Sequence, residues 1–257
     1  EESEDRKWIG KRVVGEINLA CGACEWCARG LGRHCPNRTV LGIVRHPGAF
    51  AEYLTLPERN LHALPDSIST EQAVFAEPLA AACEILDQVK ITVGEPVAVL
   101  GDGKLGLLIA QVLHAHGAQV MHFGRHREKL KISASCGIHT ERAGKRLPKH
   151  AFPIVVDATG SSSGLAQAVG MTLPRGMVIM KSTVHDRVAL DAAPVIVNEI
   201  SLIGSRCGRF EPALRLLRAC KVQVQPLIAD RFPLRDATAA FKRAAERGVI
   251  KVLFAGF

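Results

Sequence analysis

The chain has few aromatic residues and lacks long apolar runs and internal repeats. No apolar stretch approaches the roughly 20 residues needed to span a bilayer, so we expect no membrane partner. Residues 1–8 are acidic and lack the apolar core of a secretory signal. The first residue is Glu rather than Met, which indicates a fragment or a processed product.

The low aromatic content also bears on nucleic-acid binding. The net charge is +8, but aromatic residues make up only 5% of the chain and are not interleaved with basic ones. We therefore expect a solvated basic face and no nucleic-acid partner. With 257 residues, the chain is long enough for one large domain or two medium ones.

Eight cysteines in a chain of this size do not resemble a disulfide scaffold. Cys83, Cys136, Cys207 and Cys220 are scattered through apolar or loop contexts. Free thiols of this kind are typical of a reducing compartment, which favours a cytoplasmic location.

The other four cysteines form a compact motif. Cys21, Cys24, Cys27 and Cys35 follow the spacing C-x2-C-x2-C-x7-C in a glycine-containing stretch. Four thiolates can close a tetrahedral zinc site and leave no position for water, so such a site is structural and not catalytic. His34 could replace Cys35 as a ligand, but four correctly spaced thiolates make that unnecessary.

Residues 11–64 predict a β-rich region around the cysteine loop, with strands at 12–18, 40–44 and 49–56. Ser69 and Gln72 match a capping box, which predicts that an alanine-rich helix follows and ends near Val89.

Short strands and helices alternate after this point. We expect strands at 97–100, 119–123, 154–158, 177–181, 200–203 and 250–254, and helices at 104–116, 126–136, 164–171, 212–220 and 237–247. This β-α alternation predicts an α/β fold with a parallel sheet covered on both faces.

A glycine motif lies between the first of these strands and its helix. The stretch Gly101-Asp-Gly103-Lys104-Leu105-Gly106 matches G-x-G-x-x-G. In this context the first glycine makes a tight turn, the second lets a pyrophosphate approach the backbone, and the third lets the helix pack on the strand. The motif predicts a dinucleotide site.

The end of the second strand distinguishes the two nicotinamide cofactors. An acidic residue there binds the ribose 2′-hydroxyl of NAD. Here the position is Gly124, followed by Arg125, which leaves room for a 2′-phosphate and can pair with it. We therefore expect NADP in preference to NAD. The alternative is that Arg125 and Arg127 are surface charges and the adenosine end is loosely held.

Other candidate motifs are weaker. The stretch 160–164 matches the nucleophile elbow G-x-S-x-G around Ser162, but the only downstream histidine is His185 and no acid lies between them. His114 and His116 do not share a helix face, so they are a poor metal pair.

Glu77 begins an apolar helical stretch. It is either an N-terminal charge favoured by the helix dipole or a group that faces a metal or its bound water. The sequence leaves these alternatives open.

Together these stretches resemble the zinc-containing medium-chain alcohol dehydrogenases, the superfamily that includes sorbitol and threonine dehydrogenases. The resemblance runs from about Trp8 to the C-terminus. The cysteine loop and the glycine turn carry it, with the matching stretches 10–16, 48–53, 74–79, 157–160, 204–206, 232–234 and 248–252.

The resemblance implies a partial GroES-like catalytic domain with a structural zinc lobe at 1–88, a Rossmann doubly wound parallel sheet at 89–210, and a return to the catalytic domain at 211–257. It implies that the four cysteines bind the lobe zinc and that Glu77 ligates a catalytic zinc or its water. The residues implied to line the cofactor cleft are Thr159, Lys181, Ser205, Arg206 and Lys251.

The implied reaction is hydride transfer between a secondary alcohol or polyol and a nicotinamide cofactor, or the reverse reduction of a carbonyl compound. A homodimer or homotetramer is also implied.

One departure affects this expectation. Relatives carry a zinc-binding cysteine and a Gly-His-Glu segment upstream of the stretch matching 10–16, and this chain starts after both. We therefore expect this chain alone to have little or no dehydrogenase activity. The alternative class is a non-catalytic zinc- and nucleotide-binding protein. A basic nucleic-acid binder of this class would show steeply salt-dependent binding.

Overall fold

The computed structural model describes the chain except for residues 1–5, 145, 185–186 and 256–257. The chain folds as two units. The first contains Glu1–Glu77, Arg209–Arg218 and Ile228–Phe257, and the second contains Pro78–Gly208 and Ala219–Leu227. The expected domain limits at residues 88 and 210 stay a prediction.

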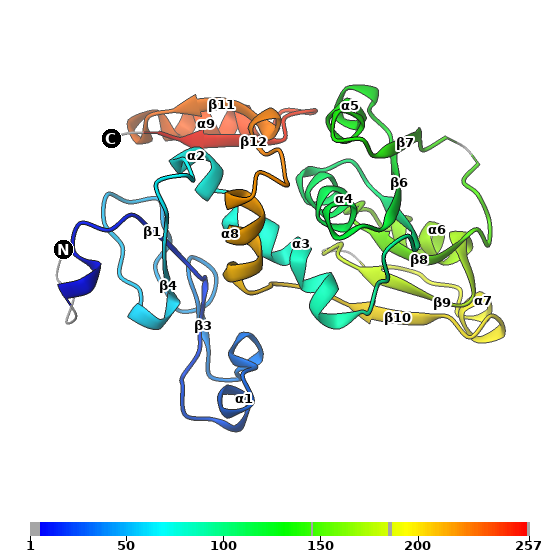
Figure 1. Ribbon diagram of the computed structural model, residues 1–257, viewed down its shortest axis with the longest axis horizontal. Coiled ribbons are helices and arrows are strands. Elements are labelled where there is room, and N and C mark those ends of the chain that lie inside the picture. The colour runs from blue at the N-terminus through cyan, green and yellow to red at the C-terminus, as the bar shows by residue number, and fades with distance from the viewer. Residues whose placement is uncertain (1–5, 145, 185–186, 256–257) are drawn as a thin grey trace. The chain divides into compact units, whose positions relative to one another are not determined.

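A six-stranded parallel sheet forms the centre of the second unit (Figure 1). Its strands are β5 (Pro96–Leu100), β6 (Gln119–Gly124), β7 (His139–Arg142), β8 (Phe152–Asp157), β9 (Thr172–Met180) and β10 (Ser201–Gly204). They lie in the order β10-β9-β8-β5-β6-β7. Successive strands are therefore added toward one edge from β5 to β7, and toward the other edge from β8 to β10. This division between β5 and β8 is the switch point at which doubly wound sheets bind ligands.

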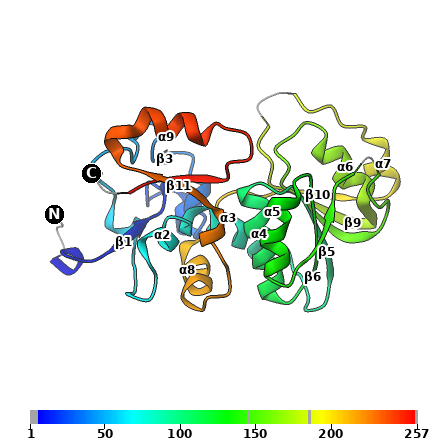
Figure 2. The same cartoon turned by 90° about the horizontal axis from the view of Figure 1, so that it is seen from above.

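Helices cover both faces of this sheet (Figure 2). On one face lie α4 (Lys104–His116) and α5 (Arg127–Ser135), and on the other lie α6 (Gly164–Met171) and α7 (Ala193–Val197). The two central strands are apolar on both sides because both faces are covered, and Val97–Leu100 and Ile154–Val156 are fully or almost fully buried. No helix in the described part of the chain has the length and apolar character to cross a membrane.

Within its described residues, the first unit contains three small two-stranded sheets. The antiparallel pairs are β1 (Val13–Gly15) with β4 (Leu61–Ala63) and β2 (Asn18–Leu19) with β3 (Thr39–Val40), and the parallel pair is β11 (Ile228–Phe232) with β12 (Lys251–Phe254). Its main helices are α2 (Thr70–Ala73), α8 (Phe210–Arg218) and α9 (Ala237–Ala244). The helix α3 (Ala76–Gln88) begins in this unit and continues in the second.

The structure corrects the expected strand at 49–56. Within the described residues no strand pairs with this segment. A strand is stable only when a neighbour takes up its backbone hydrogen bonds, so the apolar pattern alone does not make one here. Tyr53 is 80% exposed and Leu54 is 46% exposed. Of the expected strand at 40–44, Val40 lies in β3, and the chain then turns and forms one bridge between Val40 and Val44.

The predicted capping box is confirmed, because the Ser69 side chain accepts from the backbone of Gln72 and the Gln72 side chain accepts from the backbone of Ser69. The helix behind it is not continuous, since α2 ends at Ala73 and α3 begins at Ala76. The strands β4, β7 and β11 and the helix α7 were not expected.

Candidate metal centre and dinucleotide site

The four cysteines of the loop between β2 and β3 lie together. Cys24 precedes the short helix α1 (Glu25–Ala28), and Cys35 follows the 3-10 helix η2 (Gly32–His34). The Sγ atoms are 3.5 Å apart for Cys24–Cys27 and Cys21–Cys35, 3.6 Å for Cys24–Cys35 and 3.9 Å for Cys21–Cys27. A tetrahedral zinc with bonds of about 2.3 Å separates its sulfurs by about 3.8 Å. The donor set therefore fits a closed zinc site.

The electrostatics of the loop suit a divalent cation. The backbone N–H of Ala23, helped by the Cys35 thiol, lowers the pKa of Cys21 to about 6. The backbone of Cys27 favours the Cys24 thiolate, but burial and the neighbouring sulfurs outweigh it and raise the pKa of Cys24 to about 11. Without a cation, one thiolate therefore opposes the formation of the next. A bound dication removes that conflict, because it stabilises every thiolate at once.

Among the residues that the structure describes, these cysteines are the only group of three or more His, Cys, Asp or Glu side chains placed to hold a metal ion. Glu77 lies in the first turn of α3 and is not part of such a group. His34 is also outside the cysteine group. The described residues therefore fit one structural zinc and do not fit a second, catalytic one.

The glycine turn has the geometry that the motif predicts. Gly101 has φ +120°, and a Cβ there would lie 2.4 Å from the carbonyl oxygen of Ala158. A Cβ on Gly106 would lie 1.9 Å from the carbonyl oxygen of Gly101. Gly103, the N-cap of α4, faces open space, with no atom within 4 Å of a Cβ built there. Lys104 and Leu105 form the first turn of α4, whose N–H groups can bind phosphate.

Gly124 ends β6, and the exposed Arg125 follows it. The carboxylate of Asp102, the second residue of the glycine turn, lies against Gly124 and accepts hydrogen bonds from His126. Sequence reasoning missed Asp102 and His126. The available signal was an acidic residue between the two glycines of the turn.

The ammonium group of Lys181 is held by three hydrogen bonds within the second unit. Its ammonium is 2.6 Å from the carbonyl oxygen of Ala81, 3.0 Å from Oγ of Ser205 and 2.8 Å from the carbonyl oxygen of Arg206. The side chain is buried. These contacts use its three N–H donors and hold the ends of β9 and β10 to α3. A cofactor contact by Lys181, Ser205 or Arg206 stays a prediction.

Thr159 belongs to a turn organised by Asp157, which sequence reasoning also missed. The Oδ1 atom of Asp157 accepts hydrogen bonds from the backbone N–H of Thr159 at 3.0 Å, from its hydroxyl at 2.8 Å and from the hydroxyl of Ser182 at 3.0 Å. Lys251 lies in the other unit, where its ammonium is 5.5 Å from the centroid of the Phe75 ring. His185 of the rejected triad lies outside the described residues.

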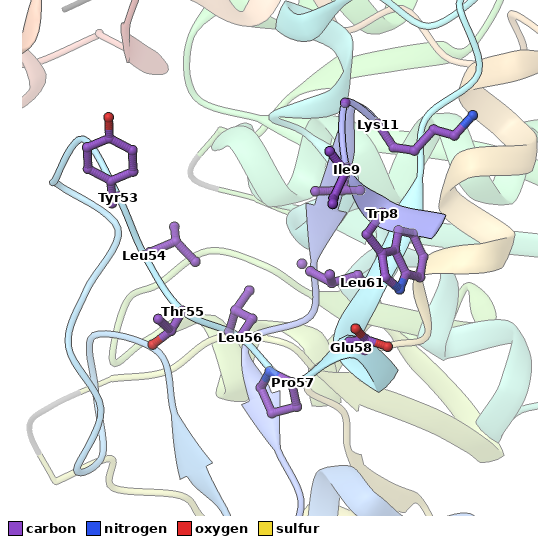
Figure 3. Close-up of a pocket in the computed structure, with 13 residues that line it drawn as sticks. Trp8, Ile9, Lys11, Tyr53, Leu54, Thr55, Leu56, Pro57, Glu58 and Leu61 are labelled. Atoms are coloured by element: carbon purple, nitrogen blue, oxygen red, sulfur yellow. The ribbon is translucent and has the colours of Figure 1, made fainter. Parts of the chain in front are cut away.

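The first unit also has an open groove of about 970 Å³ (Figure 3). Its walls come from residues before and within β1, including Trp8 and Ile9, and from the segment Tyr53–Leu61. The lining is mainly apolar, and Lys11 and Glu58 are the charged side chains among its described residues. Among the described residues, this lining does not bring together three His, Cys, Asp or Glu side chains that could hold a metal ion.

A separate polar cluster in the first unit joins Glu16, which follows β1, to β4 and α8. The Nε2 atom of His62 is 3.1 Å from Oε1 of Glu16, and the same oxygen accepts the backbone N–H of Phe210 at 3.2 Å. Glu211 lies 3.9 Å from Nδ1 of His62, and Arg33 adds a favourable charge toward Glu16. The hydrogen bond to Glu16 raises the pKa of His62. Burial opposes ionisation of Glu16, but His62 and the Phe210 N–H outweigh it and lower its pKa.

Replacing His62 by glutamine is expected to destabilise the first unit by about 1 kcal/mol near pH 5.5 and by less at pH 8. The raised pKa means that the His62 contribution is complete below 6.5 and is lost as the pH rises through the folded value. The lowered pKa means that the Glu16 contribution is complete above 4.5 and is lost in stronger acid. Urea unfolding at several pH values measures the difference.

The matched control is the exposed His139 of β7, whose replacement by glutamine should change stability little at any pH. An equal loss for His62→Gln at pH 5.5 and pH 8 would contradict an ionic origin.

Two family models match the chain. The model described as "Alcohol dehydrogenase GroES-like domain" matches residues 1–66, and the model described as "Zinc-binding dehydrogenase" matches residues 105–219. Together they match well over half of the chain. The first range contains the cysteine loop and the strands β1 to β4, and the second contains five of the six strands of the parallel sheet.

Named relatives are similar over nearly the whole chain. The sorbitol dehydrogenase of Halalkalibacterium halodurans is 28% identical over 262 residues, which are 95% of this chain and 76% of that protein. The D-arabitol-phosphate dehydrogenase of Enterococcus avium is 28% identical over 263 residues, which are 95% of this chain and 74% of that protein. The aligned region is therefore about three quarters of the length of these relatives.

The fold agrees with solved structures of the same group. A Sinorhizobium meliloti 1021 protein classed with the zinc-binding dehydrogenases, solved bound to NADP, superposes with a TM-score of 0.86 at 25% identity. The match covers 95% of this chain and 76% of that one. The expected fold class is confirmed, namely a Rossmann sheet joined to a partial GroES-like region. The chain therefore belongs to the zinc-binding alcohol dehydrogenases of the medium-chain type, a family of NAD(P)-dependent oxidoreductases.

Proposed function

We propose that the chain binds NADP(H) in preference to NAD(H) and serves hydride transfer between a secondary alcohol or polyol and the corresponding carbonyl compound. The observation that carries the cofactor assignment is the end of β6, where Gly124 and Arg125 stand in place of an acidic residue. The substrate class rests on the sorbitol and D-arabitol-phosphate dehydrogenases among the relatives. The NADP bound to the Sinorhizobium meliloti protein is consistent with the assignment.

The residues of the second unit suit this cofactor. Gly103 leaves the backbone open to a pyrophosphate, and the first turn of α4 offers N–H groups to it. Gly124 has no side chain to oppose a 2′-phosphate, and the Arg125 guanidinium can pair with it through two parallel hydrogen bonds. When bound, the nicotinamide supplies or accepts the hydride.

The metal content follows from the described residues. We expect one zinc, held by the four cysteines, because those residues contain one suitable group. Glu77 lies outside this group, so the described residues do not complete a catalytic zinc site. A protein of these 257 residues is therefore expected to oxidise alcohols slowly or not at all. Ordinary turnover by the purified chain would contradict this. The family resemblance also favours a homodimer or homotetramer, which sedimentation can test.

Replacing Arg125 by alanine is expected to weaken NADPH binding about 10- to 100-fold and to leave NADH binding unchanged within about twofold. The reason is that a charge-assisted pair with the 2′-phosphate contributes about 1.5–3 kcal/mol, and NADH lacks that phosphate. Titration followed by the fluorescence of the reduced cofactor measures both affinities without requiring turnover.

Lys131→Ala is the matched control, since it removes the same charge from the outer surface of α5, where Lys131 pairs with Glu128. It should leave both affinities nearly unchanged. Tighter NADH than NADPH binding by the unaltered chain, or an equal loss of both in Arg125→Ala, would show that the NADP assignment is wrong.

The same preparation tests the non-catalytic alternative. A nucleic-acid binder would retain random-sequence DNA with an affinity that falls steeply with salt. Cofactor binding at the glycine turn with no salt-dependent DNA binding supports the dehydrogenase assignment.

A further inference from the structure

We propose that Asp102 is a positioning residue for recognition of the cofactor 2′-phosphate, and that it acts by holding the Arg125 segment through His126. The inference rests on the proposed NADP(H) function and deepens it. It assigns a role to an acidic residue inside the glycine turn that the motif itself does not specify.

The first observation is a set of hydrogen bonds between two loops. The backbone N–H of His126 donates to Oδ2 of Asp102 at 2.6 Å. The Nδ1–H of the same histidine donates to this carboxylate, with distances of 3.0 Å to Oδ2 and 3.2 Å to Oδ1. The carboxylate thus fixes both the backbone and the side chain of the residue that follows Arg125. The glycine turn after β5 is thereby tied to the loop after β6.

The second observation is steric. A Cβ on Gly124 would lie 2.6 Å from Cβ of Asp102 and 2.8 Å from its Oδ2. The Asp102 side chain therefore occupies the space in which a side chain on the last residue of β6 would begin. Gly124, which precedes Arg125, lies against Asp102, and His126, which follows Arg125, is hydrogen-bonded to Asp102. Its backbone has little freedom as long as Asp102 is in place.

The third observation is that the Asp102 charge is enclosed and compensated. Its side chain is only 10% exposed. Burial opposes its ionisation, but the hydrogen bonds from His126 and the charges of His126 and Lys129 outweigh burial and lower the pKa of Asp102. A carboxylate arranged in this way is charged and held in place by the loop that it binds.

The buried His122 is hydrogen-bonded to the first residue of the glycine turn, Gly101. The Nε2–H of His122 in β6 donates to the carbonyl oxygen of Gly101 at 2.9 Å, and its Nδ1 accepts from the hydroxyl of Ser133 in α5 at 2.8 Å. His122 is fully buried, and burial lowers its pKa, so the ring is neutral at neutral pH. The first two residues of the glycine turn are thus both bonded to β6 or its following loop.

The test compares Asp102→Ala and Asp102→Asn in the full chain by fluorescence titration with NADPH and NADH. Alanine removes the acceptors, so NADPH should bind about tenfold more weakly and NADH should change by less than about threefold. Asparagine keeps an acceptor for the His126 N–H, so both affinities should stay within about threefold. In the double variant with Arg125→Ala, the Asp102→Ala change should add little, because Asp102 acts through Arg125.

Three results would overturn the inference. Several-fold tighter NADPH binding by Asp102→Asn would show that Asp102 repels the phosphate. An equal loss of both cofactors, or full additivity with Arg125→Ala, would show that Asp102 only stabilises the fold. Should Asp102→Ala fail to fold, His126→Ala replaces it in the same comparison, since it removes the imidazole from Asp102 and keeps the backbone N–H. An NADPH-selective loss is again expected.

The result for the unaltered chain separates this inference from the proposed function. If that chain prefers NADPH and loses the preference in Arg125→Ala, the proposed function holds and the Asp102 variants judge the inference alone.

Discussion

Replacing Cys35 by serine is expected to reduce the zinc content from about one ion per chain to less than about 0.2. It should also lower the stability of the first unit by at least about 3 kcal/mol. Cys35 is fully buried, and its sulfur lies 3.5 Å from that of Cys21 and 3.6 Å from that of Cys24. A serine oxygen is a poor zinc ligand beside three thiolates, so the site should open. Metal analysis and urea unfolding give the two quantities.

Cys220→Ser is the matched control, because Cys220 is exposed and lies outside the cysteine loop. It should keep the zinc and the stability of the parent chain. A strong chelator should reproduce the Cys35→Ser effect on the parent chain and should have little further effect on the variant. Two tightly bound zinc ions per parent chain would contradict the assignment of a single metal site.

The second large effect is expected from a pair of glycine-to-alanine changes in the same turn. Gly106→Ala should destabilise the second unit by about 3 kcal/mol or more, because the new Cβ would lie 1.9 Å from the carbonyl oxygen of Gly101. Gly103→Ala should change stability by less than about 1 kcal/mol, since the new Cβ meets no atom within 4 Å and the backbone φ of −73° suits alanine.

Gly103→Ala, which should change stability little, should have a large effect on cofactor binding. Gly103→Ala places a methyl group where the pyrophosphate approaches the backbone, so NADPH and NADH should both bind about 100-fold more weakly, equivalent to about 2.7 kcal/mol. Calorimetric titration of the folded variant measures this loss. Normal cofactor affinity in Gly103→Ala would show that the turn does not hold a dinucleotide, whatever the fold.

Elements with local end signals were predicted best. The predicted limits of α4 and α6 match the structure, and α4 begins after the Gly103 N-cap and ends at Gly117, which has φ +102°. By contrast, β7 is an edge strand of polar residues, His139–Arg142, with no apolar alternation to reveal it. The segment 49–56 has strand-like residues but pairs with no described strand. Pairing is a tertiary property, and local sequence does not contain it.

The same limit applies to the sites. The cysteine loop was readable because its ligands lie within 15 residues, and their sulfurs do converge. The interaction of Asp102 with His126 joins residues 24 positions apart, and Lys181 binds a carbonyl 100 positions away. Their roles depend on how strands and helices are placed side by side, so no local motif could predict them.

The close approach of positions 102 and 124 also constrains how cofactor preference can change. An aspartate introduced at position 124 to recruit NAD would collide with Asp102, whose Cβ lies 2.6 Å from the site of the new Cβ. Replacing Asp102 by alanine alone would release the Arg125 segment before any new acid was present. A route through these two substitutions therefore passes through an impaired protein, and a redesign that places an acid at position 124 must also alter position 102.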